Sequence, residues 1–293
     1  MTTTLDAIAR PSGGLAMVAM DQRESLRAMF DLAGKGRPGD EVLVDFKVAV
    51  AETLGPLASG FLIDREYGYQ RISPLLPAST GLILAADALT QADGGPVEET
   101  ALDQVVLAPD FDLAGAVAIK LLIIWRRDDK REARVQLAKD FIAAAASRGI
   151  LSVLEPVVRA TPGETADGSW DTEVAIREAA AELSPLRPSL YKVQVPLGGA
   201  GSADEQLRAS ERLAESIVGP WVVLSQGVER DNFLPAVEAA CRSGASGFLA
   251  GRALWSDVVG SDDVATTLRE RSVPRLERLV DVVDRYARPW GDA

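Results

Sequence analysis

A lysine within an otherwise apolar run is the first candidate for chemistry in this sequence. Residues 190–196 predict a buried strand, and strand side chains alternate between two faces, so Leu190, Lys192 and Gln194 share one side. Lysine is rarely buried without a partner, and a desolvated lysine is an amine nucleophile toward carbonyl groups. Taken alone, Lys192 also fits a simpler interpretation, in which its stem packs and its ammonium reaches water.

Two further charged residues lie within neighbouring apolar runs. Lys120 falls in the predicted strand 118–125 and Glu155 in the predicted strand 151–158. A second cation beside Lys192 favours its neutral, nucleophilic form, and a carboxylate between the two lysines can shuttle the protons that imine formation requires. The alternative is that Lys120 and Glu155 form an ion pair with no further role.

Asp21 follows the first apolar run, residues 14–20. It could orient substrate hydroxyls or take the proton released when a carbon–carbon bond breaks. It could equally be the N-cap of a helix, because Glu24 follows three residues later as in a capping box. Asp64 and Asp87 also end apolar runs, and we expect them to be loop or supporting residues.

The elements that must position these residues alternate along the whole chain. Eight short apolar strands are separated by helices, without a long linker, which predicts parallel strands joined by crossover helices. At this length the pattern favours an α/β fold of the closed (β/α)8 TIM-barrel type over an open sheet. We expect one domain over residues 1–293, loops at 92–96 and 160–170, and a C-terminal helical segment at about 262–287.

Small residues after the last two strands predict an anion site. Ser225 and Gly227 follow the seventh strand, and Gly251 and Arg252 follow the eighth. Barrels often build phosphate sites there from backbone N–H groups, and a guanidinium adds charge-assisted hydrogen bonds. Ordinary turns with a solvated arginine are the alternative.

Composition excludes several classes of function. The net charge of −12 argues against nucleic acid and anionic membrane surfaces as partners. The chain has no histidine, which removes imidazole-based acid/base chemistry and metal sites, and its single cysteine, Cys241, excludes an internal disulfide. Residues 1–11 lack the pattern of a signal peptide and no run is long enough to span a membrane, so we expect a cytoplasmic protein.

Seven segments together carry a family resemblance: 17–23, 62–64, 119–126, 154–159, 190–196, 224–228 and 247–255. They resemble the class I ketose-phosphate aldolases related to tagatose-bisphosphate aldolase, and within that group most of all the sulfofructosephosphate aldolases. The resemblance covers essentially the whole chain in order. It implies a barrel without metal or cofactor that cleaves 6-deoxy-6-sulfofructose 1-phosphate to dihydroxyacetone phosphate and sulfolactaldehyde in sulfoquinovose degradation. It also implies a homo-oligomer, with the terminal segment around Trp290 as a possible interface.

The resemblance assigns roles to the matching positions. It makes Lys192 the Schiff-base lysine, Glu155 the acid/base, Lys120 the neighbouring cation and Asp21 a polar partner of the substrate. The phosphate would be held by Ser225, Gly227, Gly251 and Arg252, and the candidates for the far end of the substrate are Gln22, Arg23 and Arg126. The lack of histidine agrees, because class II aldolases bind zinc through imidazoles.

Two positions depart from the family pattern. Gln194 stands where relatives usually carry glutamate, and Gln226 replaces a smaller residue in the anion loop.

Two alternatives for the function stay open at this point. One is cleavage of tagatose or fructose 1,6-bisphosphate by the same chemistry, and the other is a sugar-phosphate-binding barrel without catalysis.

Overall fold

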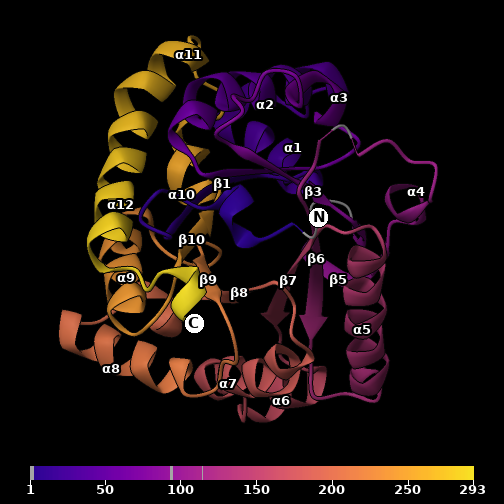
Figure 1. Ribbon diagram of the computed structural model, residues 1–293, viewed down its shortest axis with the longest axis vertical. Coiled ribbons are helices and arrows are strands. Elements are labelled where there is room, and N and C mark those ends of the chain that lie inside the picture. Colours follow the sequence, from indigo (N-terminus) through magenta and orange to yellow (C-terminus); the bar gives the residue numbers. More distant parts are fainter. Residues whose placement is uncertain (1–2, 93–94, 114) are drawn as a thin grey trace.

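The structure, a computed structural model, describes residues 3–92, 95–113 and 115–293. Within this described chain, eight parallel strands close into a barrel in the order β1-β10-β9-β8-β7-β6-β3-β2 (Figure 1). The predicted (β/α)8 barrel is therefore confirmed. The barrel strands are β1 (Leu15–Met20), β2 (Gly60–Ile63), β3 (Gly81–Ala85), β6 (Ala118–Trp125), β7 (Leu151–Val158), β8 (Leu190–Gln194), β9 (Trp221–Leu224) and β10 (Gly247–Ala250).

Helices surround the barrel and pack their apolar faces against it (Figure 1). The helices are α1 (Glu24–Phe30), α2 (Asp40–Leu54), α3 (Tyr69–Ile72), α4 (Gln104–Leu107), α5 (Arg131–Ser147), α6 (Pro162–Asp167), α7 (Thr172–Leu183), α8 (Ala203–Ala214), α9 (Arg230–Arg242), α10 (Arg252–Trp255), α11 (Val264–Thr267) and α12 (Val273–Tyr286). In α7, for example, Ala175, Ile176, Ala179 and Leu183 recur at helical spacing and are buried. Among the described helices, none is long and apolar enough to cross a membrane.

The barrel interior is filled by a separate apolar layer. Its members include Leu62, Ile83, Ala118, Val153, Leu190, Val222 and Leu249, contributed by seven different strands. Side chains two residues further along a strand point to the same interior, one layer nearer its carboxyl end. That step leads from Ala118 to Lys120, from Val153 to Glu155 and from Leu190 to Lys192. The three charged residues therefore lie directly above the buried apolar layer.

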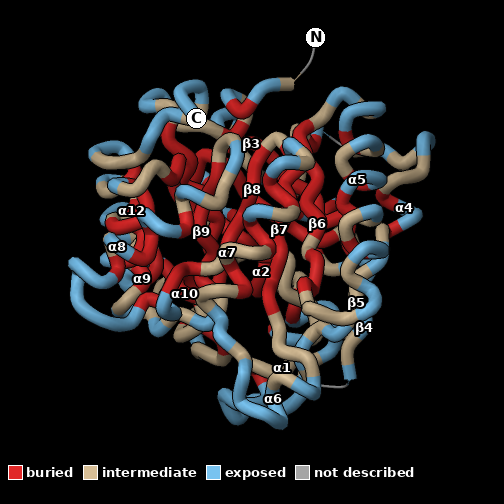
Figure 2. Tube along the Cα trace, turned by 90° about the horizontal axis from the view of Figure 1, so that it is seen from below, coloured by how far each residue is buried: buried red, intermediate tan, exposed pale blue. Residues whose placement is uncertain are grey.

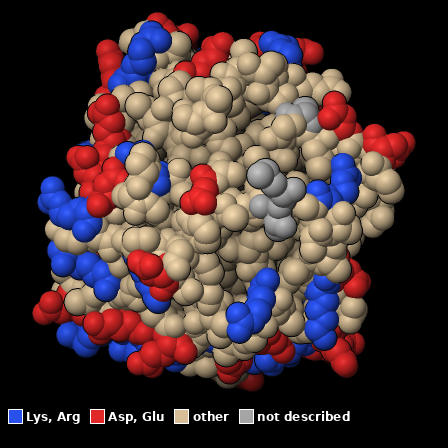
Figure 3. Space-filling view, viewed as in Figure 1, with Lys and Arg blue, Asp and Glu red and all other residues tan. Residues whose placement is uncertain are grey.

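The amino-terminal end of the barrel is closed by the chain's own ends. A short 3-10 helix, Leu5–Ile8, places Ile8 in the interior layer. Trp290 donates its backbone N–H to the Gly13 carbonyl (3.1 Å) and its indole N–H to Asp6 (3.2 Å), so this side chain contacts its own chain. Figure 2 places both termini at one end of the molecule and α1, α6 and the β4–β5 hairpin at the other. On the face seen in Figure 3, positive and negative side chains are interspersed around the rim.

Regular structure flanks one of the two segments expected to be loops and lies within the other. An antiparallel hairpin, β4 (Asp87–Gln91) and β5 (Val97–Leu102), follows β3 and surrounds the predicted loop 92–96, of which residues 93–94 lie outside the described residues. The predicted loop 160–170 contains α6, which starts with a capping box between Thr161 and Glu164. The hairpin explains why β3 pairs with β6 instead of with the next strand in sequence.

Candidate active site

A cavity of about 590 Å³ opens at the carboxyl end of the barrel strands. This is the end at which barrels carry their functional groups. The predicted site residues that line it are Asp21, Gln22, Arg23, Lys120, Glu155, Lys192, Ser225, Gly251 and Arg252. Within the described part of the chain, the lining includes neither Gly227 nor Arg126.

Lys192 is buried at the floor of the cavity. Strand β8 aligns it with Val222 of β9, and its side chain is only 4% exposed. Its Nζ lies 2.9 Å from Oε1 of Glu155 on the adjacent strand β7. The carboxylate is thus within reach to take a proton from this amine or return it.

Lys120 has a much more negative environment. Its Nζ lies 2.6 Å from Asp21, 2.8 Å from Asp87 and 3.3 Å from Oε2 of Glu155. Burial lowers the pKa of Lys120, but Asp21, Asp87 and Glu155 outweigh burial and raise it well above its ordinary value. Lys120 therefore stays charged, and the two lysines differ in character although they share Glu155.

Asp21 is bound to this cation and does not cap a helix. Helix α1 begins at Glu24 with Arg23 at its N-cap position and without a side-chain capping hydrogen bond, so the capping interpretation is wrong. Burial raises the pKa of Asp21, but Lys120 and Lys192 outweigh it and hold the pKa well below its usual range. Asp21 is consequently a permanently ionised, weak base that can accept hydrogen bonds from hydroxyl groups.

Asp87 lies closer to the chemistry than the sequence suggested. Its carboxylate contacts Lys120 directly and also accepts the Leu122 N–H (3.2 Å). Arg23 donates to the Asp87 backbone carbonyl (3.0 Å) and carboxylate (3.2 Å). Asp87 thereby fixes two cations of the cavity at once.

The residues after β9 and β10 are arranged to receive an anion. The Gly251 N–H donates to the Ser225 hydroxyl (3.3 Å), which joins the two strand ends. A Cβ at Gly251 would lie 2.7 Å from the Ala19 carbonyl oxygen, so only glycine fits this close approach. The Arg252 side chain forms no hydrogen bond or ion pair with the described residues, and burial lowers its pKa. Gln226 also lines the cavity.

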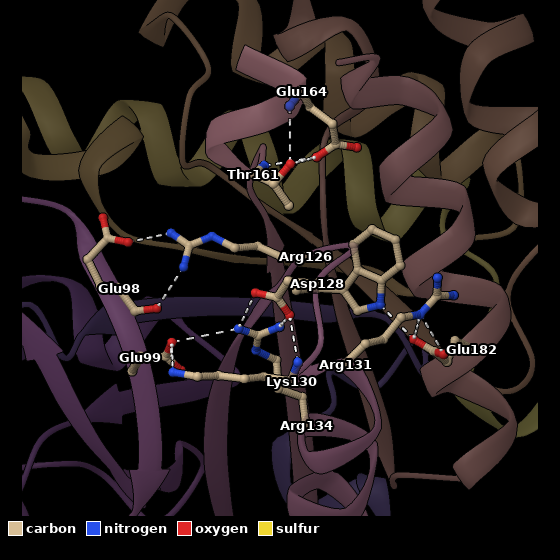
Figure 4. A network of polar contacts seen from close by, with 11 residues as sticks. Glu98, Glu99, Arg126, Asp128, Lys130, Arg131, Arg134, Thr161, Glu164 and Glu182 are labelled. Carbon is tan, nitrogen blue, oxygen red and sulfur yellow. Dashed lines mark hydrogen bonds and ion pairs between the residues drawn. The ribbon is translucent and has the colours of Figure 1, made fainter. Parts of the chain in front are cut away.

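The three residues expected at the far end of a substrate differ in availability. Arg23 is held by Asp87, whereas Gln22 has a buried Oε1 without a partner among the described residues. Arg126 is paired with Glu98 of the β4–β5 hairpin and donates to its backbone carbonyl (3.2 Å) (Figure 4). The Nε atoms of Arg23 and Arg126 are likewise buried without a partner among the described residues, but both guanidinium groups are held by a carboxylate.

Sequence reasoning missed two features of the site. Arg159 lines the cavity, although it was assigned no role, and its position four residues after Glu155 on the same strand face was the available signal. Gln194, whose Oε1 accepts the Val158 N–H (2.7 Å), holds the end of β7 instead of contacting Lys192 through a charge.

Asp64 does not line the cavity among the described residues. It forms an ion pair with Lys47 of α2 in which both side chains are 0% exposed, and it accepts the Tyr67 N–H (2.7 Å). This pair anchors α2 and the chain after β2 to each other, in agreement with a supporting role.

Comparison with known proteins identifies the family. Residues 15–257 match the model of the DeoC/LacD family aldolases. The chain belongs to this family. It is 27% identical to tagatose 1,6-diphosphate aldolase of Listeria monocytogenes serotype 4b (strain CLIP80459), over 98% of this chain and 92% of that protein. It is 29% identical to tagatose 1,6-diphosphate aldolase 2 of Streptococcus pyogenes serotype M3 (strain ATCC BAA-595 / MGAS315), over 99% of both.

Solved aldolases share the fold. A complex of fructose-bisphosphate aldolase from Plasmodium falciparum superimposes with a TM-score of 0.73 at 15% identity, covering 97% of this chain and 94% of that one. An archaeal fructose-1,6-bisphosphate aldolase gives a TM-score of 0.62 at 14% identity, covering 96% and 98%. The chain is therefore a DeoC/LacD-type aldolase, a carbon–carbon lyase, on an aldolase barrel.

Proposed function

We propose that this aldolase works without a metal, through an imine on Lys192, and cleaves 6-deoxy-6-sulfofructose 1-phosphate. The observation that supports the mechanism best is the pair of lysines that flank Glu155. Lys120 is neutralised by three carboxylates, whereas Lys192 has Glu155 alone as its ion-pair partner among the described residues. The Lys120 ammonium lies between these three carboxylates.

The first half of the reaction forms the imine. Glu155 takes the proton of the Lys192 ammonium across their 2.9 Å contact, and the free amine attacks the substrate ketone at C2. Glu155 gives this proton to the oxyanion of the adduct, takes a second proton from the nitrogen and passes it to the resulting hydroxyl, so that water leaves and an iminium forms. The positive iminium is the electron acceptor that the next step needs.

The second half breaks the C3–C4 bond. Removal of the C4 hydroxyl proton releases the aldehyde, and the electron pair of the broken bond is held as an enamine on Lys192. Asp21 is too weak a base for this proton because Lys120 and Lys192 keep it ionised. We therefore assign the proton to Glu155 and assign Asp21 to binding the substrate hydroxyls, while Lys120 supplies a fixed positive charge.

The phosphate on C1 is proposed to bind at the ends of β9 and β10. Arg252 supplies a guanidinium without a protein partner among the described residues, and Ser225 and Gly251 supply a hydroxyl and a backbone N–H. Gly227, which follows the lining residue Gln226, is proposed to contribute through its backbone.

A second candidate substrate is tagatose 1,6-bisphosphate, because the curated relatives in Listeria and Streptococcus are tagatose 1,6-diphosphate aldolases. The two substrates share the C1 phosphate and differ in the anion on C6 and in the configuration at C4. The test is kcat/KM for each ketose on purified protein, measured with and without a chelator. Preference for the sulfonate with unchanged rates in chelator supports the proposal, and preference for the bisphosphate or loss of activity in chelator contradicts it.

A further inference from the structure

Two arginines stand side by side after strands β6 and β7, and one of them, Arg159, lines the cavity. Strands β6 and β7 pair Trp125 with Val158, and the Arg159 N–H donates to the Trp125 carbonyl (3.0 Å), so the ladder continues by one residue. Arg126 and Arg159 are therefore neighbours on adjacent strands. Arg159 shares the inward face of Glu155 and lines the cavity.

Among the described residues, Glu98 is the one carboxylate that forms an ion pair with these two guanidinium groups. Glu98 on the hairpin pairs with Arg126, which is 14% exposed (Figure 4). Arg159 has no hydrogen-bond or ion-pair partner for its side chain within the described residues, and its Nε is buried. The pair of arginines therefore carries one uncompensated positive charge in a protein whose net charge is −12.

Glu98 attracts Arg159 electrostatically, but its ion pair is with Arg126. Glu99, next to Glu98, pairs with Lys130 (2.9 Å), which gives the hairpin a second attachment (Figure 4). On the other side, Gln194 holds the end of β7 through the Val158 N–H (2.7 Å). Both the hairpin and the strand end are thus fixed, and the free guanidinium stays directed at the cavity.

Arg159 and Arg252 lie on different sides of the cavity. Arg252 follows β10 and Arg159 follows β7, and β9 and β8 separate those two strands in the barrel order. Lys192 is on β8, between the two arginines. A ketose with an anionic group at each end can therefore contact both arginines while its carbonyl carbon faces Lys192.

We propose that Arg159 is the specificity residue for the anionic group on C6 of the substrate, and that it is matched to a monoanion. This inference rests on the proposed aldolase function. A sulfonate carries one negative charge, which equals the one uncompensated charge of the arginine pair. A phosphate near neutral pH carries about 1.5 to 2 negative charges and leaves an excess.

The test compares substrates with and without the C6 anion. In wild type and in Arg159→Met, kcat/KM is measured for three ketoses of the fructose configuration. They are 6-deoxy-6-sulfofructose 1-phosphate, fructose 1,6-bisphosphate and fructose 1-phosphate, whose C6 carries a neutral hydroxyl. Loss of a charge-assisted hydrogen bond should lower the ratio of sulfonate to fructose 1-phosphate cleavage by about 10- to 100-fold. Arg159→Lys, which keeps a charge, should restore part of this ratio.

Arg127→Met is the matched control. Arg127 is one residue past Arg126, on the opposite strand face, and pairs with Glu164 (2.6 Å) and Glu178 (2.7 Å). Its replacement should leave the substrate ratio as in wild type. An Arg159→Met ratio equal to the wild-type ratio, with aldolase activity present, overturns the role of Arg159 alone. Absence of cleavage of all three ketoses by the wild-type protein overturns the proposed function itself.

Discussion

Asp87→Asn is the substitution that most sharply probes how the two lysines differ. The Asp87 side chain is 1% exposed and lies between two cations, the buried Lys120 at 2.8 Å and the half-buried Arg23 at 3.2 Å. Asparagine has the same shape but removes the negative charge. Since Asp87 is one of three carboxylates that raise the pKa of Lys120, its loss must lower that pKa.

The magnitude follows from the geometry. An opposite charge at this range shifts a pKa by about 1 to 3 units, so Lys120 in the variant should lose its proton at a pH about 1 to 3 units lower. If catalysis needs the Lys120 ammonium, the alkaline limb of the kcat/KM profile moves down by the same amount. Removing one partner of a buried ion pair also costs about 3 kcal/mol, the low end of the range because Asp21 and Glu155 remain, and lowers Tm by roughly 6–12 °C.

The assay is aldol cleavage measured from neutral to alkaline pH, with Tm recorded at each pH. Asp257→Asn is the control, because Asp257 pairs with Arg275 (3.0 Å) outside the cavity and its loss should lower Tm without moving the limb. An alkaline limb that stays at its wild-type pH in Asp87→Asn, while Tm falls, would refute the assignment of Lys120 as the fixed cation.

Three further substitutions test other parts of the account. Glu155→Gln should lower kcat by about 100- to 10,000-fold because proton transfer to and from Lys192 is lost, and steady-state rates at fixed pH show it; a change of less than tenfold contradicts the acid/base role. Arg252→Met should raise KM and lower kcat/KM by about 10- to 100-fold, and an unchanged KM speaks against a phosphate contact. Lys47→Met leaves Asp64 buried without its cation and should lower the free energy of unfolding by about 3–5 kcal/mol in urea titrations; unchanged stability would show that the pair is dispensable.

The fold and the central lysines were accessible from sequence because each depends on local patterns. Successive side chains of a strand point to opposite faces, so the position of a residue in its strand predicts the face on which its side chain lies. Lys120, Glu155 and Lys192 all lie on strand faces that point into the barrel. The carboxyl ends of parallel strands then meet at one end of the barrel. Placing these three residues together required no contact beyond the one between neighbouring strands.

The remaining features depend on contacts that sequence spacing does not encode. The hairpin after β3 consists of two short, partly exposed strands with polar residues, so the sequence indicated only the loop 92–96 that joins them. Because the sequence did not predict the hairpin, it did not predict the ion pair between Glu98 and Arg126. Arg126 was therefore expected to contact the substrate, and its neighbour Arg159 was assigned no role. Asp87 was ranked as a supporting residue because the sequence could not show that its side chain turns toward Lys120.

Trapping the imine tests the central claim most directly. The purified protein is treated with sodium borohydride in the presence of dihydroxyacetone phosphate, digested, and its peptides are mapped by mass spectrometry, with Lys192→Met as the control. We predict one reduced adduct, on Lys192, that is absent from the variant. No adduct, or an adduct on Lys120 in its place, would contradict the assignment and favour a barrel that binds sugar phosphates without this chemistry.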